Sequence, residues 1–115
     1  MPNFNISPED KIRLRHMLDA AFEIRQYVQS VKRDDLNHNP MLVHSLVHLL
    51  EIIGEAANQT SDELRENTPD IPWPIMIGMR NRLIHVYFDI DLNVVWSTST
   101  IDIPMLIAEL KKLIN

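Results

Sequence analysis

Two long segments open with the same helix start and then carry apolar residues at helical spacing. Ser7 precedes Pro8 and Asn39 precedes Pro40, so each segment has a capping side chain followed by proline at the first helical position. Apolar residues recur every three or four positions behind both starts, a pattern typical of a helix that buries one face. The two helices are expected over roughly residues 8–31 and 40–58, with buried faces that contain Ile12, Met17, Leu18, Ala21, Ile24 and Val28 in the first and Leu42, Leu46, Leu49, Ile53 and Ala57 in the second.

Prolines divide the next part of the chain into shorter pieces. Residues 68–74, Thr-Pro-Asp-Ile-Pro-Trp-Pro, contain three prolines and predict a stiff loop, because proline lacks a backbone donor and restricts the residue before it. Ser61 is expected to cap a short third helix before this loop. A fourth helix is expected from about Pro72 to an interruption at residues 89–91, Asp-Ile-Asp.

The C-terminal part predicts one more helical stretch. Asp91 is expected to cap it, and Pro104 in its middle predicts either one bent helix or two consecutive helices. No segment has the alternating pattern of a strand. We therefore predict one all-α domain over residues 1–115, an antiparallel, up-and-down bundle of about five helices.

Composition limits the chemistry that the chain can carry. Its 115 residues contain no cysteine, so disulfides, thiolate catalysis and cysteine-bound zinc are excluded. The first five residues lack the basic and apolar pattern of a signal peptide, and no apolar run approaches the ~20 residues that span a bilayer. We expect a cytoplasmic protein that does not contact a membrane.

The charge balance argues against a general nucleic-acid binder. The formal net charge is −5, whereas non-specific affinity for nucleic acid comes mostly from Lys and Arg. Any contact with RNA must therefore be local. The basic residues gather at three places: Lys11, Arg13 and Arg15; Lys32 and Arg33; and Arg80 and Arg82.

Residues 80–87, Arg-Asn-Arg-Leu-Ile-His-Val-Tyr, concentrate the chemically active side chains. Arginine supplies a permanently charged fork suited to phosphate, and histidine exchanges protons near neutral pH. On a continuous helix, spacing brings Arg80 close to Tyr87 and pairs Asn81 with His85, so all four are expected to line one cleft. This combination indicates phosphodiester cleavage without a metal. A polar, solvent-facing helix end without any chemistry has the same pattern, so that alternative stays open here.

A second polar stripe follows the expected second helix. His44, His48, Glu51 and Glu55 lie at positions i, i+4, i+7 and i+11 and are donor types that bind metals in helical bundles. No other expected helix offers a matching set, so a di-metal centre is the weaker interpretation. The stripe is expected to face a partner subunit or the catalytic cleft, and Gly54 beside it allows another backbone to approach closely.

The arginine-to-tyrosine stretch resembles the signature of the HEPN superfamily, and specifically of its HepT-like toxin branch. That signature has Arg, a polar residue, three further residues and His, then one residue and Tyr. Further short blocks of the family's sequence pattern occur in the same order in this chain, which makes the resemblance specific. The resemblance covers nearly the whole chain, although the part before residue 40 matches only in helical character. These blocks are Leu-Glu-Ile-Ile-Gly-Glu-Ala-Ala (50–57), Pro-Asp-Ile-Pro-Trp (69–73), Ile-Gly-Met (77–79), Tyr-Phe-Asp-Ile-Asp (87–91) and Val-Trp (95–96).

The resemblance implies a metal-independent endoribonuclease toxin that acts as a homodimer and needs no cofactor. One imidazole is poorly placed to be both base and acid at one phosphodiester, so a symmetric dimer would let one His85 act as base and its mate as acid. Arg80 would stabilise charge on the phosphorane, and Asn81 would orient His85 or bind a phosphate oxygen. The RNA products are expected to end in 2′,3′-cyclic phosphate and 5′-hydroxyl.

The resemblance also implies a regulatory partner, a minimal nucleotidyltransferase antitoxin that transfers AMP from ATP to Tyr87. An adenylate near Arg80 would bring negative charge and bulk into the cleft and block RNA phosphate. The alternative function is a non-catalytic nucleotide-binding or partner-binding subunit of a nucleotidyltransferase complex, for which a helical bundle with a polar groove is sufficient.

Overall fold

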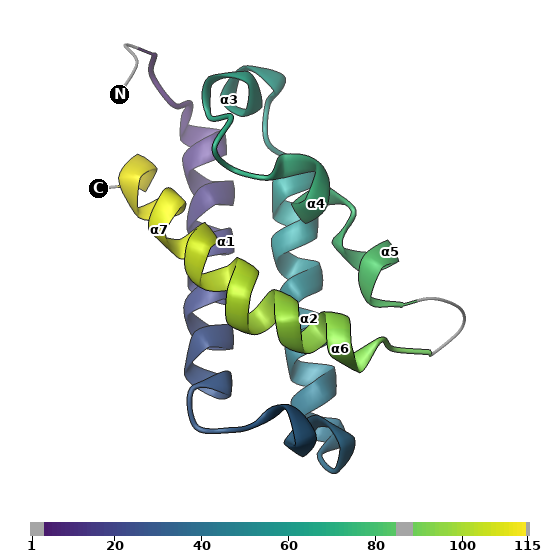
Figure 1. Ribbon diagram of the computed structural model, residues 1–115. Helices are drawn as coiled ribbons and strands as arrows, with labels where there is room; N and C mark the ends of the chain where they lie inside the picture. Colours follow the sequence, from purple (N-terminus) through teal and green to yellow (C-terminus); the bar gives the residue numbers. More distant parts are fainter. Residues whose placement is uncertain (1–3, 85–88, 115) are drawn as a thin grey trace.

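The computed structural model describes residues 4–84 and 89–114, and most of these residues are helical. The prediction of an all-α antiparallel bundle is confirmed (Figure 1). Within the described ranges, β structure is limited to one isolated antiparallel bridge between Ile84 and Ile90. In chain order the helical elements are α1 (Pro8–Val28), the 3₁₀ turn η1 (Arg33–Asn37), α2 (Pro40–Asn58), α3 (Asp62–Asn67), α4 (Trp73–Ile77), α5 (Met79–Leu83), α6 (Leu92–Ser97), the π-helical turn η2 (Thr98–Asp102) and α7 (Ile103–Ile114).

The four expected helix starts are confirmed by their capping hydrogen bonds. In each, a side-chain oxygen accepts a hydrogen bond from the backbone N–H three residues later, which satisfies a donor that has no partner within the helix. The accepting residues are Ser7, Asn39, Ser61 and Asp91, and the donating ones are Asp10, Leu42, Leu64 and Val94, each pair at 3.1 Å.

Asp10 joins the start of α1 to the start of α3. Its carboxylate accepts hydrogen bonds from the backbone N–H of Ser61 at 2.9 Å and from the Ser61 hydroxyl at 2.5 Å. The Asp10 residue is 5% exposed. These two bonds hold the residue that caps α3, so α3 is fixed to α1 although the partners are 51 positions apart.

The helix α2 lies in the middle of the fold, with α1 on one side and α4 and α5 on the other (Figure 1). By length and composition this 19-residue helix, with a mean hydropathy of 1.2, is apolar enough to cross a membrane, contrary to the expectation that no run is long enough. Half of that apolar window is buried in the fold (50%). Its fully buried Leu46, Leu50 and Ile53 are core residues.

The last helical stretch accommodates Pro104 and stays continuous. It crosses α1 and α2 diagonally and runs from Leu92 to Ile114 through the π-helical turn Thr98–Asp102 (Figure 1). Proline clashes with the carbonyl four residues earlier in a regular α-helix, and the wider π turn just before Pro104 relieves that clash. Of the two expected forms, the structure has the continuous one.

The expected fourth helix is wrong as a single element. It is divided at Gly78 into α4 and α5, and α5 ends at Leu83, because Ile84 has an extended backbone (φ −123°, ψ 115°). Gly78 is a poor helix former, and Ile84 pairs instead with Ile90. Among the described residues, the helix that carries Arg80 therefore ends at Leu83.

Candidate active site

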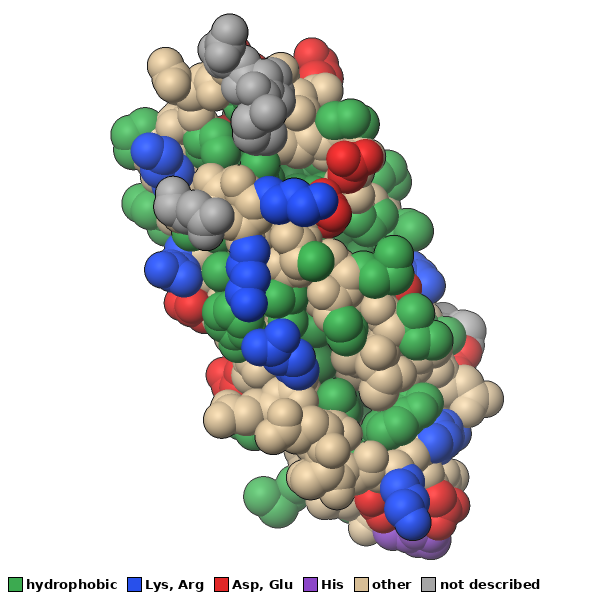
Figure 2. Space-filling model, turned by 60° about the vertical axis from the view of Figure 1, so that its left-hand side comes forward, with side chains coloured by type: hydrophobic (Ala, Val, Ile, Leu, Met, Phe, Trp, Pro, Cys, Tyr) green, Lys and Arg blue, Asp and Glu red, His purple; other side chains and the backbone are tan. Residues whose placement is uncertain are grey.

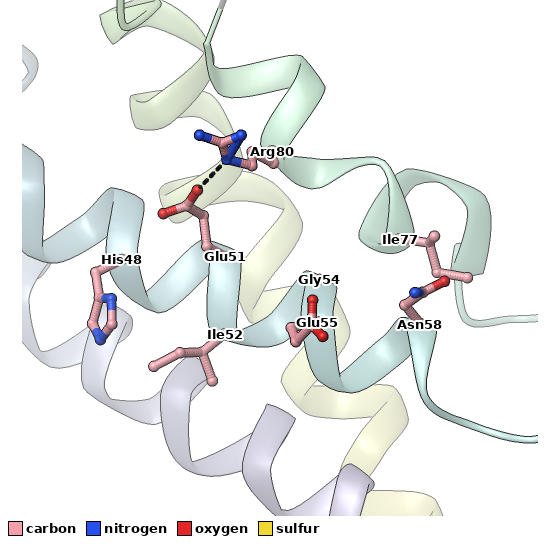
Figure 3. Close-up of a pocket in the computed structure, with 8 residues that line it drawn as sticks. All are labelled: His48, Glu51, Ile52, Gly54, Glu55, Asn58, Ile77 and Arg80. Atoms are coloured by element: carbon pink, nitrogen blue, oxygen red, sulfur yellow. Dashed lines mark hydrogen bonds and ion pairs between the residues drawn. The ribbon is translucent and has the colours of Figure 1, made fainter. Parts of the chain in front are cut away.

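Arg80 lies on α5, at the edge of an open cavity between α5 and α2. Its side chain is 71% exposed, and its Nε donates a hydrogen bond to Oε2 of Glu51 on α2 at 2.9 Å (Figure 3). The Nε bond leaves the two terminal nitrogens of the guanidinium for other acceptors: within the described residues, no hydrogen bond involves them. Arg80 is thus held through Nε, and within the described residues its two terminal nitrogens have no hydrogen-bond partner.

The cavity has a volume of about 370 Å³ and follows the surface of α2. This volume lies within the range of small-ligand pockets. Figure 3 shows His48 and Ile52 at one end and Asn58 with Ile77 at the other, with Glu51, Gly54 and Glu55 between them. The site is therefore a trough lined by the half-buried carboxylate of Glu51, the exposed carboxylate of Glu55 and the exposed guanidinium of Arg80.

Gly54 allows α5 to come this close to α2. A Cβ atom added at Gly54 would lie 2.8 Å from the carbonyl oxygen of Met76 and 3.2 Å from Cβ of Met79. The first distance is shorter than real Cβ contacts allow, and the atom it meets is backbone, which moves only with its helix. The expectation that Gly54 admits another backbone is confirmed, and the approaching backbone is that of Met76 in α4, four residues before Arg80.

The polar stripe on α2 faces this trough for most of its length. His48, Glu51 and Glu55 line it, whereas His44 does not. Glu55 accepts a hydrogen bond from the side chain of Gln59 at 3.1 Å. Among the residues that the structure describes, which include the whole stripe, no three His, Asp or Glu side chains form a group that could hold a metal ion. The weaker interpretation, a di-metal centre, therefore has no support. The other interpretation, that the stripe faces the catalytic cleft, agrees with the geometry.

The remaining predicted site residues are only partly placed. Asn81 follows Arg80 on α5 and is exposed, and its side chain makes no hydrogen bond within the described ranges. Arg82 is half-buried, and one of its terminal nitrogens is buried without a hydrogen-bond partner in the described part. His85 and Tyr87 lie outside the described residues. The roles of Arg80, Asn81, His85 and Tyr87 therefore stay predictions.

Sequence reasoning missed the pair between Arg80 and Glu51. These residues are 29 positions apart. The only signal in the sequence was the polar stripe itself, which places Glu51 on a cleft-facing side of α2 but does not name its partner.

Comparison with known proteins identifies the family of this chain. The family model described as "Ribonuclease HepT-like" matches residues 17–113. A Methanocaldococcus jannaschii protein named "Putative RNase MJ1380" is 33% identical over 88% of this chain and 93% of the relative. A protein of Caldanaerobacter subterraneus subsp. tengcongensis, "Putative RNase TTE0752", is 34% identical over 89% of this chain and 91% of the relative.

A third relative carries the family name. The Thermococcus cleftensis protein "Probable ribonuclease HepT" is 33% identical over 87% of this chain and 91% of its own length. No solved structure matches the chain. The family model covers most of the chain, including the Gly54 approach and Arg80, and the resemblance seen in the motif is confirmed. The chain belongs to the HepT-like ribonuclease family of the HEPN superfamily.

Proposed function

We propose that this protein is a metal-independent endoribonuclease toxin that cleaves RNA through its own 2′-hydroxyl. One observation carries the proposal: in a chain of the HepT-like family, a guanidinium that Glu51 holds through Nε alone projects from α5 over an open trough. The relatives named as ribonucleases support an RNA substrate. Arg80 supplies the charge that a pentacoordinate phosphorane needs as negative charge builds on its oxygens.

Glu51 positions Arg80 in this scheme. It binds only Nε at 2.9 Å, so the two terminal nitrogens keep their fork geometry for two phosphate oxygens. A carboxylate also restrains a long side chain that is 71% exposed and would otherwise sample many rotamers. Glu51 does not touch the phosphate, and its effect passes through Arg80.

Proton transfer falls to His85, and this step requires two chains. Cleavage needs a base for the 2′-hydroxyl and an acid for the leaving 5′-oxygen, and one imidazole cannot hold both positions at once. In a homodimer joined near the motif, one His85 takes the proton and the other gives one. The phosphodiester bond to the 5′-oxygen breaks as the bond from the 2′-oxygen forms. The products then end in 2′,3′-cyclic phosphate and 5′-hydroxyl.

The proposed control of this activity acts on Tyr87. A nucleotidyltransferase antitoxin would transfer AMP to its hydroxyl, with pyrophosphate as the leaving group. The added phosphate would compete with RNA for the terminal nitrogens of Arg80, which the Glu51 pair leaves unoccupied. Modified protein is therefore expected to be inactive.

The test uses purified protein, made without any nucleotidyltransferase, and cellular RNA in EDTA. Cleavage with cyclic phosphate ends in the parent, and its loss in His85→Ala and Arg80→Gln, is the expected result. Suitable controls are His38→Ala, an exposed histidine 3.5 Å from Asp34, and Arg33→Gln, an arginine bonded to Asn37 and Asn93. Ends with 3′-hydroxyl, or activity that EDTA abolishes, would refute the mechanism. No cleavage by parent protein with an unmodified Tyr87 would favour a binding subunit instead.

A further inference from the structure

The candidate active site lacks the charge to hold a polyanion. Its lining contains two carboxylates, Glu51 and Glu55, and one guanidinium, Arg80, which is already paired with Glu51. The formal charge of these three groups is −1, and the whole chain carries −5. Since affinity for RNA comes largely from cations that displace counterions at phosphates, another surface must supply it.

A cluster on α1 and α7 has the required charge, and we call it the Phe22 patch: Phe22, Arg25 and Lys111. The guanidinium carbon of Arg25 lies 5.1 Å from the centroid of the Phe22 ring, and Nζ of Lys111 lies 5.4 Å from it. Phe22 is half-buried and packs against the core, whereas Arg25 and Lys111 are exposed. The ring attracts a cation over its face, so it gathers two charges from two helices at one place.

Within the described residues, no acidic side chain forms an ion pair with Arg25 or Lys111. Glu23, next to Phe22, instead accepts a hydrogen bond from the Tyr27 hydroxyl at 2.6 Å. Figure 2 faces the side of the molecule that is on the left in Figure 1 and shows a line of Lys and Arg side chains down its middle. The Phe22 patch is therefore a local concentration of positive charge on a chain of net charge −5.

The same face continues along α1 beyond the patch. Lys11 and Arg15 lie on the helical column that leads to Phe22 and Arg25, at spacings of four, seven and three residues. Arg15 is partly compensated, because Asp19 lies 3.8 Å away. The column gives a phosphate backbone a path along α1, with Arg25 and Lys111 as its strongest point.

We propose that the Phe22 patch binds backbone phosphates of the substrate RNA at nucleotides away from the cleaved bond. The proposal rests on the ribonuclease function proposed above, since it takes RNA as the polyanion. The contacts are to phosphates and carry no sequence preference. RNA is thus held by a surface separate from the trough, where the two carboxylates oppose phosphate binding.

The experiment measures binding of a fluorescent 20-nucleotide single-stranded RNA with 2′-O-methyl groups, which cannot be cleaved through the 2′-hydroxyl. The dissociation constant is measured at several salt concentrations for the parent and for the double variant Arg25→Gln, Lys111→Gln. Each lost phosphate contact on a single strand lowers the salt slope by about 0.7, so the double variant is expected to lose about 1.4. At about 0.1 M salt this corresponds to a roughly 25-fold weaker affinity.

Lys112→Gln is the matched control. Lys112 is the next residue on α7 and has the same charge, but its Nζ donates to Glu109 Oε2 at 3.0 Å, and this hydrogen bond raises the pKa of Lys112. Because its charge is already compensated, the control is expected to change affinity by less than about twofold. The charge-conserving double variant Arg25→Lys, Lys111→Arg is expected to bind as the parent does, which separates charge from packing on the ring.

Three results would overturn the proposal. The first is an equal loss of RNA affinity in the Lys112 control and in the double variant, and the second is an unchanged salt slope in the double variant. The third is a double variant that binds RNA as the parent does but no longer binds anionic lipid vesicles. Cleavage of unmodified RNA by the same proteins separates the two proposals. A parent that cleaves RNA while the double variant binds normally refutes only the Phe22 patch. A parent that binds RNA through the patch but never cleaves it refutes only the nuclease.

Discussion

Replacing Gly54 by alanine tests the packing that sets the position of Arg80. The added Cβ would lie 2.8 Å from the Met76 carbonyl oxygen and 3.2 Å from Cβ of Met79, so α4 and α5 must move away from α2. Extra volume of this kind in a packed interior costs about 1–3 kcal/mol. The substitution also stabilises α2 by about 1 kcal/mol, because alanine is a better helix former than glycine. The difference is about 0–2 kcal/mol. Because the clash is with backbone, which cannot rotate away, we expect the upper half of that range, a net loss of about 1–2 kcal/mol.

The assay is thermal unfolding followed by circular dichroism, together with RNA cleavage. A loss of about 1–2 kcal/mol in a chain of 115 residues lowers Tm by about 3–8 °C. Gly78→Ala is the matched control, because among the described residues its added Cβ would meet the Pro74 carbonyl oxygen alone, at 3.3 Å. Cleavage is expected to fall more than stability explains, since the displaced element carries Arg80. A Gly54→Ala protein with a Tm equal to or above that of the parent would refute the close approach.

Three further predictions concern the caps and the trough. Asp10→Ala removes both bonds to Ser61 and is expected to lower the free energy of unfolding by about 1–3 kcal/mol in urea titration, whereas Asp19→Ala on the exposed side of α1 should change it by less than about 0.5 kcal/mol. Asn39→Ala removes the cap of α2 and is expected to cost about 1 kcal/mol in the same assay, and an unchanged midpoint would contradict the capping bond. Glu51→Gln is expected to lower kcat, because Arg80 loses its restraint, and to lower KM, because the trough loses a negative charge; a raised KM with an unchanged kcat would show that Glu51 binds substrate rather than positions Arg80.

The parts of the fold that follow from short-range chemistry were predictable. The caps at Ser7, Asn39, Ser61 and Asp91 each depend on a side chain and a backbone N–H three residues away, so four residues of sequence contain the whole interaction. The same holds for α2, whose ends agree with the predicted ones because a proline start and an apolar stripe define it.

The break between α4 and α5 was not predictable, because its cause is elsewhere in the chain. The apolar spacing of Met76, Met79 and Leu83 suits one helix, and all three are buried. The junction bends at Gly78 as it packs against Gly54, and the extended Ile84 pairs with Ile90. In both contacts, the two partners become neighbours only once the bundle has formed. Arg80 and Glu51 likewise become neighbours only in the folded bundle. The sequence therefore indicated a cleft but not the contacts inside it.

The shortness of α4 and α5 sets how the candidate active site can open. Each has five residues, far fewer than a helix needs to persist alone in water. Their order comes from the burial of Trp73, Met76, Met79 and Leu83 against the rest of the core. Such a segment is a cooperative unit of low stability, and its amide hydrogens should exchange well before those of α1 and α2. We therefore expect Arg80 to lie on a part of the fold that opens locally more readily than the long helices do.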